Sequence, residues 1–443
     1  MPETYDLVLH GGTVQMPGGG VETDIAVRGG RIAAFGRFSA GDAGWSLDCR
    51  GLHVLPGVID TQVHFREPGL EHKEDLATGT AAAALGGVTA VFEMPNTRPP
   101  TTGAGDFAEK CRRARGRVWV DVAFFIGATA DNVDDLAVLE TLPGCAGVKV
   151  FMGSSTGDLL VADDQTLADV LAHGSRRVAV HAEDEARLKE RWALVQDGAD
   201  PARHPQWRDV ETAQTATRRL LALLGETRRR VHVLHVTTAE EMELLAQARD
   251  LVTVEVTPQH LSLAAPACYE QLGTRAQMNP PIRGVRHQEA LWRAVADGIV
   301  DCIGSDHAPH TLDEKAKPYP QSPSGMPGVQ TLVPVMLDHV AAGRLSLERF
   351  VDLTSAGPAR IYGIAGRGRI ARGYRADFTV VDLAAQRTIS DREMASRCGW
   401  TPFDNQKVRG WPMATVVAGR IVMREGTLIG KPAGRLVDFL DCL

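Results

Sequence analysis

The sequence predicts an α/β fold, in which a closed parallel (β/α)8 barrel of the TIM type carries a small β domain built from both chain termini. Three observations lead to this prediction. The chain has 443 residues, enough for a barrel of roughly 250 residues and an appendage. About eight short β-branched segments in the middle of the chain are each followed by an Ala/Leu-rich segment with helical spacing. Both ends show short alternating strands between glycine turns instead.

The two ends of the chain share the same strand pattern. Near the N-terminus, strands are expected at residues 5–9, 21–27 and 31–35, with turns at Gly11-Gly12 and Gly29-Gly30. The pattern returns at residues 377–383, 416–418 and 421–423. Because these ends flank a different middle, we expect them to meet in one domain. This predicts a small β domain of residues 1–54 with 366–443, and a barrel of residues 55–365.

The middle of the chain alternates strand and helix patterns. The expected barrel strands are residues 54–63, 88–94, 118–126, 147–150, 178–181, 231–236, 252–256 and 299–304. An open doubly wound sheet is the alternative arrangement of such units. That fold would place a glycine-rich phosphate turn after an early strand, and no convincing turn of this kind is found. The barrel is therefore favoured.

Composition narrows the range of partners. The chain has 55 acidic and 48 basic residues and no marked basic patch, which argues against nucleic acid. Its longest apolar runs, such as residues 220–224, are shorter than the ~18 residues that a membrane span needs. Seven dispersed cysteines without a Cys-x-x-Cys pair indicate reduced thiols. We expect a cytoplasmic protein with a small-molecule substrate and no nucleic-acid or membrane partner.

Polar side chains recur where the expected barrel strands end, which is where catalytic residues of such barrels lie. One histidine at such a place is more often a core or rim residue. Five suitable strand ends reverse this expectation, because unsatisfied imidazoles and carboxylates are costly inside a protein. Imidazole and carboxylate groups suit zinc. The candidate ligands are His64, His181, His235 and Asp306.

Lys149 follows the same strand-end pattern, although its usual pKa of about 10.4 would make it a cation that repels metal. It either neutralises a buried acid, or it loses its proton and adds carbon dioxide to become an anionic carbamate that bridges two metals. The residues alone leave both interpretations open. Glu183 and Asp184, next to His181, are expected either to orient imidazoles or to be solvated charges at the rim.

Eight short motifs occur in order along almost the whole chain. They are Pro-Gly-Val-Ile-Asp at 56–60, Val-His-Phe-Arg-Glu-Pro-Gly at 63–69, Met-Pro-Asn-Thr at 94–97, Val-Lys-Val-Phe-Met at 148–152, Thr-Pro-Gln-His at 257–260, Met-Asn-Pro-Pro-Ile-Arg at 278–283, Ser-Asp-His-Ala-Pro-His at 305–310 and Gly-Met-Pro-Gly at 325–328. With them the chain resembles the amidohydrolase superfamily and, within it, the dihydroorotases. The resemblance implies a barrel with a small β-sandwich, one or two zinc ions, and carbon dioxide carried as a carbamate on Lys149. It also implies a homodimer and an association with aspartate transcarbamoylase.

The resemblance assigns roles to individual residues. His64 and Asp306 would bind the first metal, and the carbamate on Lys149 would bridge to a second metal on His181 and His235. Asp306 would also take a proton from the attacking water and deliver it to the departing ring nitrogen. Three residues match positions that hold the substrate carboxylate: Arg66, Asn96 and His310. Three others match positions that present backbone groups to the pyrimidine ring: Asn279, Pro327 and Gly328.

Gln62 departs from the His-x-His pattern that is usual in the family. Residues 62 and 64 point to the same face of a strand, so Gln62 stands where a ligand is expected. An amide oxygen is a poor zinc ligand, so Gln62 would be a weak one at most. This departure weakens the expectation of two fully occupied metal sites and of full catalytic activity.

The implied activity is that of a dihydroorotase, the reversible hydrolysis of L-dihydroorotate to N-carbamoyl-L-aspartate in pyrimidine biosynthesis. Hydantoinases, dihydropyrimidinases and allantoinases are an alternative, but their substrates lack the ring carboxylate that Arg66 would bind. The other alternative is a non-catalytic partner of aspartate transcarbamoylase, supported only by Gln62. The small polar segment at 153–157 is expected to be either a mobile loop over the site or a rigid turn.

Overall fold

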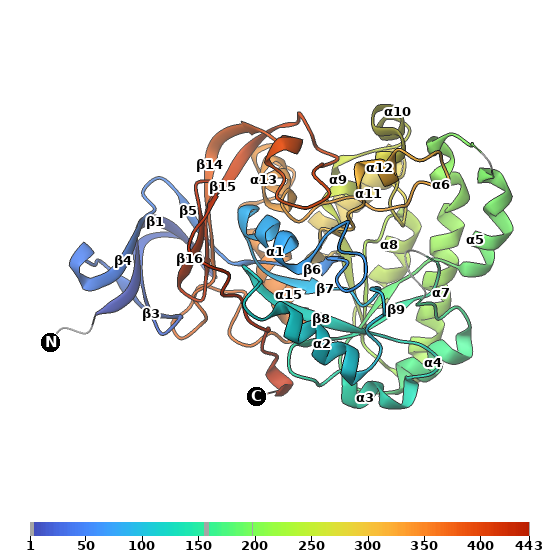
Figure 1. Cartoon of the computed structure of the whole chain (residues 1–443), viewed down its shortest axis with the longest axis horizontal. Helices are drawn as coiled ribbons and strands as arrows, with labels where there is room; N and C mark the ends of the chain where they lie inside the picture. Colours follow the sequence, from blue (N-terminus) through green and yellow to red (C-terminus); the bar gives the residue numbers. More distant parts are fainter. Residues whose placement is uncertain (1–3, 155–158, 197, 443) are drawn as a thin grey trace.

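The computed structural model describes residues 4–154, 159–196 and 198–442, and it contains a β-rich part beside a helix-covered barrel (Figure 1). Most of the segment at 153–157 therefore lies outside the described residues. None of the helices in the described ranges combines the length and the apolar content that crossing a bilayer requires.

The barrel is an eight-stranded parallel sheet in which the strands follow one another in chain order. Its strands are β6 (Val58–Val63), β7 (Val88–Glu93), β8 (Asp121–Gly127), β9 (Cys145–Phe151), β10 (Val178–His181), β11 (Val231–Val233), β12 (Val252–Val256) and β13 (Cys302–Ile303). The first strand meets the segment that follows the last one, because Val63 bridges His307 and the His64 amide donates to the His307 carbonyl at 2.7 Å. The predicted barrel is confirmed.

Helices cover the outside of this sheet, and the strands are buried on both faces, as their β-branched and small residues require. The helices after successive strands are α1 (Leu76–Leu85), α2 (Ala104–Ala114), α3 (Leu136–Leu139), α4 (Asp164–Ala172), α5 (Glu185–Arg191), α6 (His204–Trp207), α7 (Val210–Thr227), α8 (Ala239–Ala246), α9 (Pro258–Ser262), α10 (Ala267–Leu272), α11 (Val285–Ala296), α12 (Leu312–Lys315), α13 (Leu332–Ala341), α14 (Leu347–Val351) and α15 (Gly357–Tyr362). The longest, α7, is capped at its N-terminus by Asp209, whose side chain accepts from the Thr212 amide.

The second sheet joins the two ends of the chain. Its order is β17-β16-β15-β14-β5-β1-β2-β3, with β4 beside β1. The strands are β1 (Tyr5–Met16), β2 (Gly19–Arg28), β3 (Arg31–Gly36), β4 (Ala43–Asp48), β5 (His53–Pro56), β14 (Phe378–Thr388), β15 (Lys407–Val417), β16 (Arg420–Arg424) and β17 (Thr427–Leu428). Antiparallel pairing of β5 with β14 places Val54 opposite Val380. The termini therefore meet in one sheet, as expected.

Several predicted strands have different limits in the structure, and two of the differences occur at glycines. The segment at 54–63 is divided at Gly57 between the two sheets. Glycine is required at this point, since a Cβ would lie 2.4 Å from the Thr89 hydroxyl oxygen. The turn expected at Gly11-Gly12 is instead an irregularity within β1, where the register with β2 shifts between Leu9 and Gly12.

Two segments of residues 366–443 leave the second sheet and pack against the barrel. One reaches the barrel mouth, where the Trp400 indole N–H donates to the His310 carbonyl at 2.8 Å. The other lies against β8, where the Val122 amide donates to the Arg435 carbonyl and the Val437 amide donates to the Val122 carbonyl, both at 2.9 Å. We propose the division into residues 1–54 with 366–443 and residues 55–365, with these two segments as the contacts between the domains.

Candidate active site

Five predicted ligands lie at one end of the barrel. His64 follows β6, Lys149 lies in β9, His181 ends β10, and His235 and Asp306 follow β11 and β13. All five side chains are buried. His64 Nε2 is 3.3 Å from Asp306 Oδ1, and His181 Nδ1 is 3.0 Å from His235 Nε2. The fold therefore brings together the residues that the strand-end pattern selected.

A buried ion pair orients His181. Glu183 Oε2 accepts from His181 Nε2 at 2.9 Å and pairs with Arg208 Nη2 at 2.6 Å. Although burial favours the neutral acid, Arg208 and then His181 hold the pKa of Glu183 below its usual range. With its proton fixed on Nε2, His181 presents the lone pair of Nδ1 to His235. Glu183 thus has the orienting role that was expected for one of the two acids after His181.

Asp184 makes different contacts from those of Glu183. Its side chain accepts from the Arg187 amide at the start of α5 and pairs with Arg219 at 2.6 Å. Asp184 therefore caps a helix and is buried, which differs from both expected roles, an orienting group for an imidazole and a solvated charge at the rim.

Lys149 has no direct acidic partner among the described residues. Its ammonium group is buried, has no hydrogen-bond partner within the described part of the chain, and lies 4.3 Å from the centre of the Phe151 ring. Burial lowers its pKa to about 7, which makes the neutral amine available near neutral pH. A neutral amine is the form that adds carbon dioxide. An unpaired buried nitrogen beside two imidazoles fits a carbamate that holds a metal.

Gln62 and His64 both contact Asp306. Gln62 Nε2 donates to Asp306 Oδ1 at 3.1 Å, while Gln62 Oε1 is buried and has no hydrogen-bond partner among the described residues. Burial, and then the negative charge of Glu255, raises the pKa of Asp306 to about 7. An acid with this pKa holds and releases a proton near neutral pH, as a group that serves first as base and then as acid must do.

Three site residues have strained backbones. Arg66, His235 and Asp306 have φ of 64°, 38° and 43°, in the left-handed region that non-glycine residues rarely adopt. Each such conformation costs on the order of 1–3 kcal/mol, and such residues cluster at functional sites. The positive φ angles turn these side chains into the barrel mouth just after their strands end. No sequence pattern predicted these conformations.

Arg66, Asn96 and His310 lie together beside the ligands. Arg66 Nη2 is 3.3 Å from His310 Nε2, and Asn96 Oδ1 is 2.7 Å from His64 Nδ1. Arg66 is buried and donates to the Pro309 carbonyl at 3.3 Å, but it forms no ion pair with a carboxylate of the described residues. Burial lowers its pKa to about 10, so it stays a cation at neutral pH.

Comparison with known protein families shows which family the chain belongs to. The model described as "Amidohydrolase family" matches residues 53–422, which is most of the chain. The chain belongs to the amidohydrolase family. The resemblance predicted from the motifs is confirmed.

Individual relatives agree with this assignment. A dihydroorotase of Methanothermobacter thermautotrophicus is 37% identical over 410 residues, covering 92% of each chain. An allantoinase of Rubrobacter xylanophilus is 36% identical over 449 residues, covering 98% of this chain and 97% of the relative. Among solved structures, the L-hydantoinase of Arthrobacter aurescens has a TM-score of 0.93 and 29% identity, covering 98% of this chain and all of that one.

The backbone positions expected to face the substrate ring are partly engaged within this amidohydrolase. The Gly328 amide donates to His307 Nδ1 at 3.0 Å, and Asn279 Oδ1 lies 3.0 Å from His204 Nε2. Pro327 precedes the same turn. Ring contacts by Asn279, Pro327 and Gly328 stay a prediction, in which the Gly328 amide has a competing partner.

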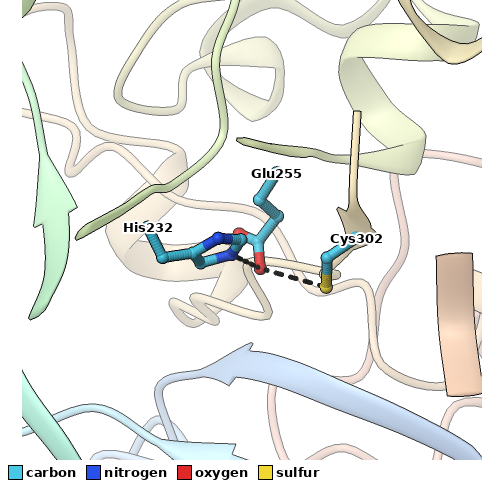
Figure 2. Close-up of side chains that lie close together, drawn as sticks. All are labelled: His232, Glu255 and Cys302. Atoms are coloured by element: carbon cyan, nitrogen blue, oxygen red, sulfur yellow. Dashed lines mark hydrogen bonds and ion pairs between the residues drawn. The ribbon is translucent and has the colours of Figure 1, made fainter. Parts of the chain in front are cut away.

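A buried polar cluster, not foreseen from the sequence, lies in the barrel interior. His232, Glu255 and Cys302 come from β11, β12 and β13, and Figure 2 shows their side chains converging. Glu255 Oε2 is 3.5 Å from His232 Nε2 and accepts from the Thr61 hydroxyl at 2.7 Å. The Glu255 charge acts on both Asp306 and Lys149, where it favours the protonated form. Glu255 in this cluster therefore adds to the electrostatic field at the ligands, where burial is the larger influence.

Lys315 is a second group that sequence reasoning missed. Its buried ammonium donates to the carbonyls of Gln277, Pro323 and Gly325 at 3.2, 2.8 and 3.2 Å. These carbonyls belong to the two segments that lead to Asn279 and to the Pro327-Gly328 turn. Lys315 therefore joins both segments at the rim of the site.

We expect Lys315→Met to loosen this rim. The Pro323 and Gly325 carbonyls would lose this donor, at roughly 1–3 kcal/mol for each buried group left unsatisfied, while the Gln277 carbonyl keeps the Gly325 amide at 2.9 Å. The melting temperature should fall by several degrees, and the KM for substrate should rise several-fold while metal content stays constant. Lys317→Met, at an exposed lysine two residues away, is the matched control. An unchanged KM in a destabilised Lys315→Met protein would contradict a positioning role.

The Glu183 contact leads to a further prediction. In Glu183→Gln, an amide replaces the carboxylate that fixes the proton of His181, and Arg208 loses its counter-charge. Loss of such an orienting partner costs about 10–100-fold in metal affinity. Competition with a chromogenic chelator measures this, with the exposed Glu190→Gln as control. Equal zinc affinity in the two variants would show that Glu183 does not orient a ligand.

Proposed function

We propose that this amidohydrolase is a dihydroorotase, which reversibly hydrolyses the cyclic amide of L-dihydroorotate to N-carbamoyl-L-aspartate. Relatives from several archaea and bacteria bear that name, including those of Methanothermobacter thermautotrophicus and Halobacterium salinarum. The Halobacterium relative is 36% identical and covers 98% of both chains. Family membership alone does not say which cyclic amide is the substrate, so the residues of the site have to distinguish between the candidate rings.

The observation that carries the proposal is the buried, unpaired guanidinium of Arg66. A buried cation is costly unless an anion faces it, and Arg66 forms no ion pair with a carboxylate among the described residues. The guanidinium is a planar fork that matches a carboxylate with two hydrogen bonds. Dihydroorotate carries such a carboxylate on its ring, whereas hydantoin and allantoin do not. We assign His310, which contacts Arg66, and Asn96, which contacts His64, to the same carboxylate.

We propose that zinc is the metal and that Lys149 holds it as a carbamate, together with His181 and His235. The lone pair of His181 Nδ1 supports this assignment, and so does the Lys149 nitrogen, which has no hydrogen-bond partner among the residues that the structure describes. Bound zinc would polarise the ring carbonyl and lower the pKa of water from ~15.7 to about 7.

The chain's own residues then move the proton and hold the ring. Asp306 takes the proton from the attacking water at a carboxylate oxygen and gives it to the departing ring nitrogen. Its raised pKa suits both halves of this transfer. Arg66 fixes the ring through its carboxylate, so that the scissile amide faces Asp306. In the reverse direction the same groups cyclise carbamoyl-aspartate.

Allantoinase or hydantoinase activity is the second candidate. It is favoured by the allantoinase relative and by the fold of the L-hydantoinase. A single panel separates the candidates: kcat/KM of zinc-loaded protein on L-dihydroorotate, allantoin and hydantoin. We expect dihydroorotate to exceed the others by at least about 10²-fold, the worth of two charge-assisted hydrogen bonds. A preference for either uncharged ring would overturn the proposal.

The oligomeric state and the cellular location are proposed as well. We propose a homodimer in the cytoplasm, and an association with aspartate transcarbamoylase, on the strength of the resemblance. Size-exclusion chromatography with light scattering, alone and with aspartate transcarbamoylase added, tests both assemblies.

A further inference from the structure

The barrel mouth holds two sets of candidate metal ligands that differ in their hydrogen bonding. In the first set, Glu183 holds the His181 proton on Nε2, so Nδ1 presents a lone pair toward His235 Nε2 at 3.0 Å. Lys149 adds a buried nitrogen without a hydrogen-bond partner among the described residues. Each group can turn a lone pair, or the oxygens of a carbamate, toward one cation.

In the second set, a donor occupies the place of a ligand. His64 Nε2 lies 3.3 Å from Asp306 Oδ1, but Gln62 Nε2 donates to that same oxygen at 3.1 Å. An amide N–H is a donor and cannot bind a cation. Turning the amide over would set Gln62 Oε1 against the Asp306 oxygen, acceptor to acceptor. Amide oxygen is also absent from the usual zinc ligands, which are thiolate, imidazole and carboxylate.

Charge balance agrees with a single ion. One zinc ion brings two positive charges, which the Lys149 carbamate and the Asp306 carboxylate neutralise, and the buried Glu255 carboxylate adds a further negative charge that acts on both residues. Arg66 is then left to neutralise the carboxylate of the substrate. A second zinc ion would add two more positive charges in a buried space beside Arg66, and uncompensated buried charge is strongly unfavourable.

We propose that this chain binds a single metal ion, on Lys149, His181 and His235, and that the Gln62 amide replaces a second ion by holding Asp306 through a hydrogen bond. Gln62 is then a positioning residue for Asp306. The inference rests on the proposed metal-dependent function, and it concerns the number and place of the ions.

Metal content tests the proposal directly. The protein is loaded with excess zinc and bicarbonate, freed of unbound metal, and its zinc is measured by mass spectrometry against protein concentration. We expect about one zinc per chain in the wild type and in Gln62→Leu, and about two in Gln62→His, where an imidazole on the same strand face completes the second set. About two zinc ions in the wild type, or none, would overturn the proposal.

The place of the ion is tested by removing one ligand from each set. We expect His181→Ala to lose the zinc and His64→Ala to keep it. Loss of zinc from His64→Ala but not from His181→Ala would place the ion on the second set and contradict the proposal. Electron paramagnetic resonance of the manganese-loaded protein gives a second readout. An uncoupled spectrum is expected for the wild type and an exchange-coupled one for Gln62→His. If Gln62→His fails to fold, the wild-type zinc count and spectrum decide alone, since coupling in the wild type would contradict a single ion.

These readouts do not depend on which ring is hydrolysed. A protein with one zinc that prefers allantoin would end the dihydroorotase proposal and leave the single-ion proposal standing. A protein that hydrolyses dihydroorotate with two zinc ions would do the opposite.

Discussion

Replacing Lys149 with alanine should remove metal and activity together. The carbamate would be lost, and His181 and His235 alone make a poor zinc site, because zinc takes four ligands in structural sites and three protein ligands in catalytic ones. Zinc content should fall to a small fraction of the wild-type value. Turnover of dihydroorotate should fall by at least about 10³-fold, since both the polarised carbonyl and the ionised water depend on the metal.

Chemical rescue makes this prediction specific. Short carboxylates such as acetate or propionate fit the space left by the side chain and should restore part of both zinc content and turnover. The exposed Lys189→Ala is the control for loss of a lysine charge near the rim. A Lys149→Ala protein with full activity would remove the carbamate from the account. Loss of activity with full zinc content would instead make Lys149 a group that acts on the substrate.

Arg66→Met should damage the hydrolysis of dihydroorotate far more than that of an uncharged hydantoin. Methionine keeps much of the apolar volume but removes the two hydrogen bonds to the carboxylate, at about 1.5–3 kcal/mol for each charged bond. We expect kcat/KM on dihydroorotate to fall by roughly 10²–10⁴-fold. Arg66→Lys should lie between, because an ammonium keeps the charge without the planar fork.

The comparison needs a control at a neighbouring arginine. Arg98 is exposed, and Arg98→Met should leave kcat/KM on both substrates within about two-fold, as surface substitutions usually do. Equal losses on dihydroorotate and hydantoin in Arg66→Met would show that Arg66 supports the fold of the site and not the recognition of a carboxylate.

The barrel could be predicted from the sequence because two features indicate its strands. Each is a β-branched run buried on both faces, and most end in a polar residue that a buried strand would not otherwise carry. The eighth strand shows the limit of this reasoning, since only Cys302–Ile303 of residues 299–304 are paired. Pairing of a short terminal strand depends on its neighbours, which residue preferences do not describe.

The candidate ligands were found because strand ends of a parallel barrel converge, whatever the distance between them in the chain. The groups around them were not found, because their partners come from loops. Arg208 reaches Glu183 from the segment before α7, and Trp400 reaches the His310 carbonyl from the far end of the chain. The left-handed backbone of Arg66 and Asp306 was also not predicted, because residues other than glycine rarely adopt it and no local sequence pattern indicates it.

The most direct test of the account is the rate of L-dihydroorotate hydrolysis as zinc is returned to metal-free protein, followed by the loss of the substrate's ultraviolet absorbance. We expect a rate of hydrolysis that rises in proportion to the added zinc and levels off at about one ion per chain. The activity should disappear when a chelator is added. Folded protein that holds zinc and leaves dihydroorotate intact would contradict the account.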